Sequence, residues 1–365
     1  MTRILGPDEL RWRRRRAKRG RIATVSVIGG AGYVGSLVVE RLLRQGFTVT
    51  VLDTLMFGDE SLRDLADHPR FGLVHGDLRD IEAIVHTCAG ADAVIHLGAL
   101  VGDPACAVDE ATTLTINRDA TLTVARVSRA LGVQRLIFAS TCSVYGASDD
   151  ILTEESVVAP ISVYARSKAE SEQLLMPMVG DRFHPTVLRF GTLYGNSRRK
   201  RFDLVVNLLA ARAVIDGEIT ITGGDQWRPF VHVSDCADAV IRCLHAPHSV
   251  VSGRVFNVGS DAQNHQLRDI GDLIKAMVPC ARVIFSESAS AEANYRVSFD
   301  RIERELGFRP SLTLIDGIKE IQDAVRQGLI TDYTDARYSN YLSLVTGRAQ
   351  LDVVYPTVAA EAGVG

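Results

Sequence analysis

The chain has 365 residues, of which 46% are hydrophobic and 23% charged, with 30 glycines, 11 prolines and six cysteines. Its net charge of −3 is uneven, because nine of the 41 Lys and Arg residues lie in residues 1–21 beside only two acidic residues, leaving 32 basic and 42 acidic residues elsewhere. This composition excludes a disordered, collagen-like or disulfide-rich chain, and no apolar run reaches the roughly 18 residues of a membrane-spanning helix.

Residues 1–21 form a basic N-terminal extension. The run contains a single aromatic residue, Trp12, so we expect a solvated arm and no specific nucleic-acid binding. The cysteines show no CxxC pair and no spacing suited to zinc, so we expect no metal site. No secretory signal follows the basic run, and we therefore expect a reduced, cytoplasmic protein with no membrane partner.

Short apolar strands alternate with amphipathic helical patterns through the first half of the chain. Strands are predicted at residues 24–28, 48–52, 72–74, 93–97, 136–139 and 186–190. Helical spacing of apolar residues lies between them, as in 34–42 and 114–131. This alternation predicts βαβ units and an α/β fold with a Rossmann-type, doubly wound parallel sheet over residues 22–190.

The regular alternation weakens after residue 190. Polar loops interrupt shorter strands near residues 219–221 and 255–258. We therefore expect residues 191–330 to form a smaller, mixed C-terminal lobe that binds substrate, with segments that can interleave with the sheet. Residues 331–365 are predicted to be a C-terminal surface extension.

A glycine-rich turn follows the first strand in Val25–Gly35. Gly29 begins the tight turn, Gly32 lets the backbone approach a pyrophosphate, and Gly35 allows close helix–strand packing. Asp53 ends the second strand, eighteen residues after Gly35, where a carboxylate can bind the adenosine ribose. Because a carboxylate there repels a 2′-phosphate, the sequence favours NAD over NADP.

Two further motifs predict proton-handling chemistry. Thr141 lies in the sequence STCSVYG at the end of the fifth strand, the edge at which open α/β sheets bind ligands. Tyr164 and Lys168 follow at helical i, i+4 spacing, which places both side chains on one face. An ammonium beside the phenol is expected to lower the phenol pKa and make Tyr164 a usable base.

Together these motifs resemble the extended short-chain dehydrogenase/reductase superfamily, in its NAD-dependent nucleotide-sugar epimerase/dehydratase branch. The resemblance covers about residues 22–330. The motifs that carry the resemblance are GGAGYVG, Asp53, Gly76-Asp77-Leu78, His96–Leu100, Asn117, STCSVYG, YARSK, RPFVHVSD, FNVG, Arg296 and LGFRP.

The resemblance implies a role for each matching residue. Thr141, Tyr164 and Lys168 match the catalytic trio. The residues implied to bind NAD are Gly29, Gly32, Tyr33, Val34, Gly35, Asp53, Asp77, Leu78, Leu97, Ala99, Asn117, Tyr164 and Lys168. Those implied to bind the nucleotide sugar are Cys142, Thr192, Asn207, Arg228 and Arg296, with the two arginines on its diphosphate.

Three positions depart from the family pattern. Cys142 and Ser143 stand where dehydratases of the family carry an Asp-Glu pair, which speaks against standard 4,6-dehydration. Thr192 stands where sugar epimerases often carry Asn. Cys142 is expected to be a buried packing thiol, with an acid–base role as the alternative. The run Arg198–Arg201 fits a binding loop and a solvated loop equally well, and His96 is expected to be a core histidine.

The primary functional prediction is an NAD-dependent nucleotide-sugar epimerase that inverts C4 through a transient keto-sugar. A nucleotide-4-keto-sugar reductase uses the same trio with exchangeable cofactor and is the nearest alternative, followed by a dehydratase. A non-catalytic NAD sensor or scaffold would be expected to lose the Tyr/Lys pair. The resemblance also implies a homodimer.

Overall fold

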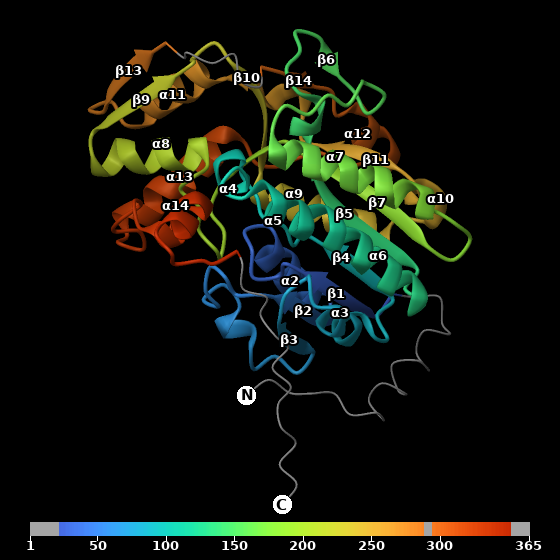
Figure 1. Ribbon diagram of the computed structural model, residues 1–365. Helices are drawn as coiled ribbons and strands as arrows, with labels where there is room; N and C mark the ends of the chain where they lie inside the picture. The colour runs from blue at the N-terminus through green and yellow to red at the C-terminus, as the bar shows by residue number, and fades with distance from the viewer. Residues whose placement is uncertain (1–21, 288–293, 352–365) are drawn as a thin grey trace, which may run out of the picture.

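The computed structural model describes residues 22–287 and 294–351; the predicted basic extension lies outside these ranges. Seven strands form one parallel sheet in the order β11-β7-β5-β4-β1-β2-β3 (Figure 1). Their bounds are β1 Thr24–Ile28, β2 Thr48–Asp53, β3 Phe71–His75, β4 Ala93–His96, β5 Arg135–Thr141, β7 His184–Phe190 and β11 Val255–Val258. This arrangement confirms the predicted Rossmann-type fold.

The sheet is covered on both faces. All five residues of β1 are buried, and Val25 in its centre is in register with Val49 of β2 and Ala93 of β4. Helices α2 (Gly35–Arg44) and α9 (Val233–His245) share one apolar core with one face of the sheet. Helices α3 (Ile81–Cys88), α6 (Ala120–Ala130) and α7 (Val163–Leu175) share the core on the other face. Coverage of both faces explains the continuous apolar strand sequences.

A second lobe lies beside the carboxyl ends of the strands, with its own apolar core around Phe230 and Ile270 (Figure 1). Its elements are β8 Thr192–Tyr194, α8 Val205–Ile215, β9 Glu218–Thr222, β10 Trp227–His232, β12 Asn264–Gln266, α11 Leu267–Met277, β13 Arg282–Ser286 and α13 Leu314–Arg326. The remaining short elements are α4 Asp103–Cys106, α5 Glu110–Leu114, β6 Ile151–Leu152, α10 His248–Val251, β14 Arg296–Val297, α12 Asp300–Leu306 and α14 Asn340–Val345.

The two lobes interleave along the chain. β11 lies within the range 191–330 expected for the substrate lobe, yet it pairs in parallel with β7, Val255 opposite Val187 and Val258 opposite Phe190. Helix α9 likewise comes from that range and packs on the sheet face shared with α2. Phe256 and Val258 of β11 are fully buried at this edge of the sheet.

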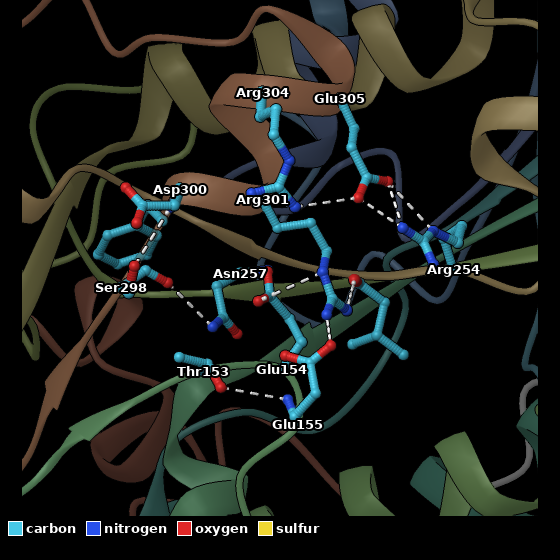
Figure 2. A network of polar contacts seen from close by, with 12 residues as sticks. Thr153, Glu154, Glu155, Arg254, Asn257, Ser298, Asp300, Arg301, Arg304 and Glu305 are labelled. Atoms are coloured by element: carbon cyan, nitrogen blue, oxygen red, sulfur yellow. Dashed lines mark hydrogen bonds and ion pairs between the residues drawn. The ribbon is translucent and has the colours of Figure 1, made fainter.

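A polar network ties α12 back to the same edge (Figure 2). Arg301 contacts the carboxylate of Glu154 at 3.7 Å and donates to the Val255 carbonyl at 3.3 Å. The backbone N–H of Asn257 donates to Glu154 at 2.8 Å, and Arg254 pairs with Glu305 at 2.5 Å. These contacts hold β11 and α12 as one unit against the β7 edge.

The described part of the predicted C-terminal extension, residues 331–351, packs against the body. Asn340 at the start of α14 is 1% exposed. Its side-chain amide donates to the Val101 carbonyl at 2.9 Å, and its backbone N–H donates to Asp203 at 3.1 Å. This segment is therefore packed and hydrogen-bonded against the rest of the fold. No helix in the described residues combines the length and apolar character required to cross a bilayer.

Candidate active site

A cavity of about 450 Å³ lies between the carboxyl ends of the central strands and the loops of the second lobe. Fifteen of the nineteen residues predicted to form the site line it. They are Gly29, Gly32, Tyr33, Val34, Gly35, Asp53, Asp77, Leu78, Leu97, Ala99, Thr141, Tyr164, Lys168, Thr192 and Arg228. The other four, Asn117, Cys142, Asn207 and Arg296, are not among its lining residues.

The glycine-rich turn brings the backbone close to the start of α2. Gly29 has φ +80°, and a Cβ added there would lie 2.5 Å from the Gly98 nitrogen. A Cβ added at Gly35 would lie 2.1 Å from the Gly29 carbonyl oxygen. The turn therefore requires glycine at both positions, and residues 32–35 line the cavity at the N-terminus of α2. Such a cradle fits a pyrophosphate.

Two carboxylates lie near this turn. Asp53 accepts hydrogen bonds from the backbone N–H groups of Ala31 and Leu55, both at 2.9 Å. Burial raises the pKa of Asp53, and the two backbone donors oppose that shift. Asp77 is held by Arg79 through two side-chain hydrogen bonds of 3.0 and 2.7 Å. Local contacts thus fix the orientation of both carboxylates in the wall.

Thr141 and Tyr164 face each other across the end of β5. The Thr141 hydroxyl lies 2.7 Å from the Ser143 hydroxyl, and its hydrogen bond to Tyr164 lowers the phenol pKa. Burial is the largest effect on Tyr164 and raises its pKa, while the positive charge of Arg201 lowers it. Arg201 and Thr141 thus favour the phenolate, whereas burial and the nearby Cys106 and Asp103 favour the protonated phenol.

Lys168 lines the same cavity as Tyr164. Its Nζ donates to the Ala139 carbonyl at 2.9 Å and lies 4.8 Å from the centroid of the Phe138 ring. Burial lowers the pKa of Lys168 itself to about 8, and the nearby Cys106 and Glu172 oppose that shift. The amine is thus hydrogen-bonded to the end of β5.

Cys142 lies behind the cavity wall. Its thiol is fully buried and donates to the Arg189 carbonyl at 3.2 Å, and burial raises its pKa. Ser143 lines the cavity in its place. This arrangement favours the packing role for Cys142. His96 is also fully buried, 2.9 Å from the Thr121 hydroxyl, and burial lowers its pKa to about 3, as expected of a neutral core histidine.

Three other predicted site residues support the wall from behind or from one side. The buried Asn117 accepts from the Leu100 N–H at 2.8 Å and donates to its carbonyl at 2.9 Å, which fixes the loop after β4. Asn207 accepts from the Gly195 N–H at 2.8 Å and donates to the Tyr33 hydroxyl at 3.2 Å. Arg296 donates to the Asp149 carbonyl at 2.7 Å.

Several lining residues were not in the predicted site: Asp103, Ser143, Arg199, Arg201, Tyr295 and Asn340. Arg199 and Arg201 are 8% and 7% exposed, so this part of the run Arg198–Arg201 is not a solvated loop. The density of basic residues was the signal that could have found them. Asn340 and Tyr295 carried no such signal, because their place in the wall depends on long-range packing. No group of three or more His, Cys, Asp or Glu side chains within the described ranges is arranged to hold a metal.

A doubly wound sheet with a pyrophosphate cradle beside a Tyr/Lys pair defines a class of protein: Rossmann-fold enzymes that use a pyridine dinucleotide to oxidise and reduce a bound substrate. The family model for the NAD dependent epimerase/dehydratase family matches residues 25–259, and the chain belongs to that family.

The similar proteins include both kinds of enzyme in this family. A dTDP-glucose 4,6-dehydratase from Actinoplanes sp. is 30% identical, over 81% of this chain and 95% of the relative. A UDP-glucose 4-epimerase from Corynebacterium glutamicum is 27% identical, over 80% and 93%. The solved dTDP-glucose 4,6-dehydratase DesIV from Streptomyces venezuelae, with NAD bound, is 25% identical at a TM-score of 0.74, over 83% and 97%. The protein is thus an NAD-dependent enzyme that acts on a nucleotide sugar, as an epimerase or a dehydratase.

Proposed function

We propose that the protein is a nucleotide-sugar 4-epimerase. The observation that carries this proposal is the end of β5, where Thr141 is followed by a buried thiol and a hydroxyl instead of two carboxylates. Elimination of water from a hexose needs an acid and a base at this position, and the fully buried Cys142 thiol is hydrogen-bonded to a backbone carbonyl. Inversion at C4 needs only the groups that line the cavity.

The chain's own residues divide the work as follows. Tyr164 takes the proton of the C4 hydroxyl, and Thr141 donates a hydrogen bond to the oxygen on which charge develops. The charge of Arg201, which lowers the Tyr164 pKa, stabilises the phenolate that this step requires. Bound NAD⁺ would supply reversible hydride transfer at C4, and inversion would require the keto-sugar to turn within the cavity before the hydride returns. Tyr164 then returns the proton, so the reaction has no net redox change.

The glycine-rich turn and Asp53 orient the dinucleotide, and Thr192 and Arg228 contribute the substrate side of the cavity. A guanidinium such as that of Arg228 is suited to the diphosphate of a nucleotide sugar because it can bind two phosphate oxygens together. The homodimer and the cytoplasmic location predicted from the sequence stay predictions.

The test is incubation of the purified protein, without added cofactor, with a panel of UDP-, GDP-, CDP- and dTDP-hexoses, followed by NMR of the products. The proposal expects a C4 epimer with full retention of the C6 hydroxyl. A 4-keto-6-deoxy product would instead identify a dehydratase. In a parallel incubation with a nucleotide 4-keto-sugar and added NADH, stoichiometric NADH oxidation would identify a reductase, and either result would overturn the proposal.

A further inference from the structure

Arg199 lines the cavity with an incomplete set of hydrogen-bond partners. One of its terminal nitrogens donates to the side-chain oxygen of Asn340 at 2.7 Å, and its guanidinium carbon lies 4.1 Å from the centroid of the Phe57 ring. Its Nε is buried without a hydrogen-bond partner. Within the described part of the chain, Arg198 and Arg201 pair with Asp64 and Asp203, whereas Arg199 forms no ion pair.

A buried guanidinium without a counter-charge is unfavourable unless a ligand supplies the charge. Burial and the positive charge of Arg201 lower the pKa of Arg199 to about 9, while the charges of Asp203 and Asp53 oppose that shift from a distance. Because the side chain lines the cavity, an anion that enters the cavity can pair with the guanidinium directly.

The position of Arg199 favours the pyrophosphate of NAD over the diphosphate of the nucleotide sugar as its partner. Its guanidinium lies over the ring of Phe57, four residues after Asp53, in the cavity that Asp53 and the glycine-rich turn also line. The turn offers backbone N–H groups but no cation. Arg228, the lining arginine predicted to bind the sugar nucleotide, lies 6.0 Å from the centroid of the Tyr295 ring instead.

We propose that Arg199 binds the pyrophosphate of NAD together with the glycine-rich turn, and that Asn340 is the positioning residue that holds the guanidinium in the cavity wall. Asn340 is itself fixed, because it donates to the Val101 carbonyl and to Asp203. The C-terminal segment thereby contributes to cofactor retention through one side-chain oxygen. The cofactor is then held between two walls that are far apart in the sequence.

Binding of NAD⁺ to the full-length, cofactor-free protein, measured by calorimetry, tests this role. Arg199→Gln is expected to weaken NAD⁺ binding about 10- to 100-fold, the usual cost of losing a charge-assisted hydrogen bond. Arg199→Lys retains the charge without the planar fork and is expected to lose less. Arg198→Gln, which removes the same charge one residue earlier and outside the cavity lining, is the matched control and should bind NAD⁺ as the wild type does.

Asn340→Asp separates ligand binding from a structural role. A carboxylate at this position would pair with Arg199 and compete with the pyrophosphate for it, so NAD⁺ binding is expected to weaken. Because the carboxylate cannot donate to the Val101 carbonyl as the amide does, thermal unfolding of the cofactor-free variant checks that the fold is retained. If Arg199 served only the fold, Asn340→Asp would leave NAD⁺ affinity unchanged. That result would overturn the proposal.

The diphosphate of the substrate offers the same chemistry as that of the cofactor, so UDP binding is measured on the same variants. Unchanged UDP affinity with weakened NAD⁺ binding supports the proposal. Weakened UDP binding with unchanged NAD⁺ binding assigns Arg199 to the sugar nucleotide and overturns it, as does an Arg199→Gln protein with unchanged affinity for both. Because no sugar has to turn over, a failure of the epimerase proposal would not alter these readings.

Discussion

The two walls of the cavity are built in opposite ways. The glycine-rich wall comes from seven consecutive residues, 29–35, and its shape is set by backbone contacts such as that between Gly35 and the Gly29 carbonyl. The arginine wall takes Arg199 and Arg201 from one loop and Asn340 from a distant helix, and side-chain hydrogen bonds join them. Substitutions that add atoms should therefore disrupt the glycine-rich wall, and substitutions that remove hydrogen-bond partners should disrupt the arginine wall.

The largest expected effect is on turnover, and it comes from a residue, Tyr164, that belongs to neither wall. Tyr164→Phe removes one hydroxyl and leaves both walls intact, so turnover should fall about 10²–10⁴-fold, the usual contribution of acid–base catalysis. NAD⁺ affinity should stay close to that of the wild type. The measurement is the initial rate on the substrate found in the panel, with calorimetry as the control. A variant that kept more than about a tenth of the turnover would remove Tyr164 from the mechanism.

Adding a single methyl group should disrupt the glycine-rich wall. In Gly35→Ala the new Cβ would lie 2.1 Å from a backbone oxygen that cannot rotate away. We expect a loss of about 3 kcal/mol in the free energy of unfolding, at the upper end of overpacking effects, together with loss of NAD⁺ binding. Gly180→Ala, whose Cβ meets no atom within 4 Å, is the control and should stay within about 0.5 kcal/mol of the wild type. Equal urea midpoints for the two variants would contradict the prediction.

The arginine wall should instead be sensitive to one carboxamide. Asn207→Ala leaves the Gly195 N–H and the Arg201 carbonyl without the partners that they now have at 2.8 and 2.9 Å. The expected loss is about 2 kcal/mol in the free energy of unfolding, the usual cost of unsatisfied buried groups. Urea unfolding measures it. A variant as stable as the wild type would show that water replaces the amide and that this wall does not depend on it.

The smallest expected effect concerns the burial of Lys168, whose pKa is lowered to about 8 from an ordinary value of 10.5. Between these values the unfolded chain binds the proton and the native protein does not, so the lysine's contribution to stability improves as the pH rises. Relative to Lys168→Met, the wild type should therefore gain on the order of 2 kcal/mol between pH 7 and pH 9.5. Urea unfolding of both cofactor-free proteins at the two pH values measures this difference. A difference independent of pH would show that the amine is not desolvated.

Sequence reasoning reached the glycine-rich wall more completely than the arginine wall. Gly29, Gly35 and Asp53 line the cavity as expected because each belongs to a short motif whose geometry is local. Tyr164 and Lys168 follow from helical spacing for the same reason. The hydrogen bond from the Lys168 amine to the Ala139 carbonyl could not be predicted, because helical spacing fixes the face on which a side chain lies and not the acceptor that it meets.

The residues that sequence reasoning missed are placed by contacts between distant segments. Asn340 reaches the cavity only because it is fixed by Val101 and Asp203. Asn207, expected to touch substrate, instead bonds to Gly195 and Tyr33. A polar residue that holds a wall and one that faces a ligand have the same chemistry in the sequence, and only burial separates them.

The place of β11 has a consequence for how the protein can be made and divided. A fragment that ended at residue 190 would leave the backbone groups of β7 unpaired along one whole edge, a template for association with other chains. During synthesis, this edge stays unpaired until residues 255–258 have emerged from the ribosome. Residues 191–254 of the chain are made before that strand. Residues 22–190 are therefore not expected to form a stable domain on their own. A soluble truncation would have to retain the chain at least through α12.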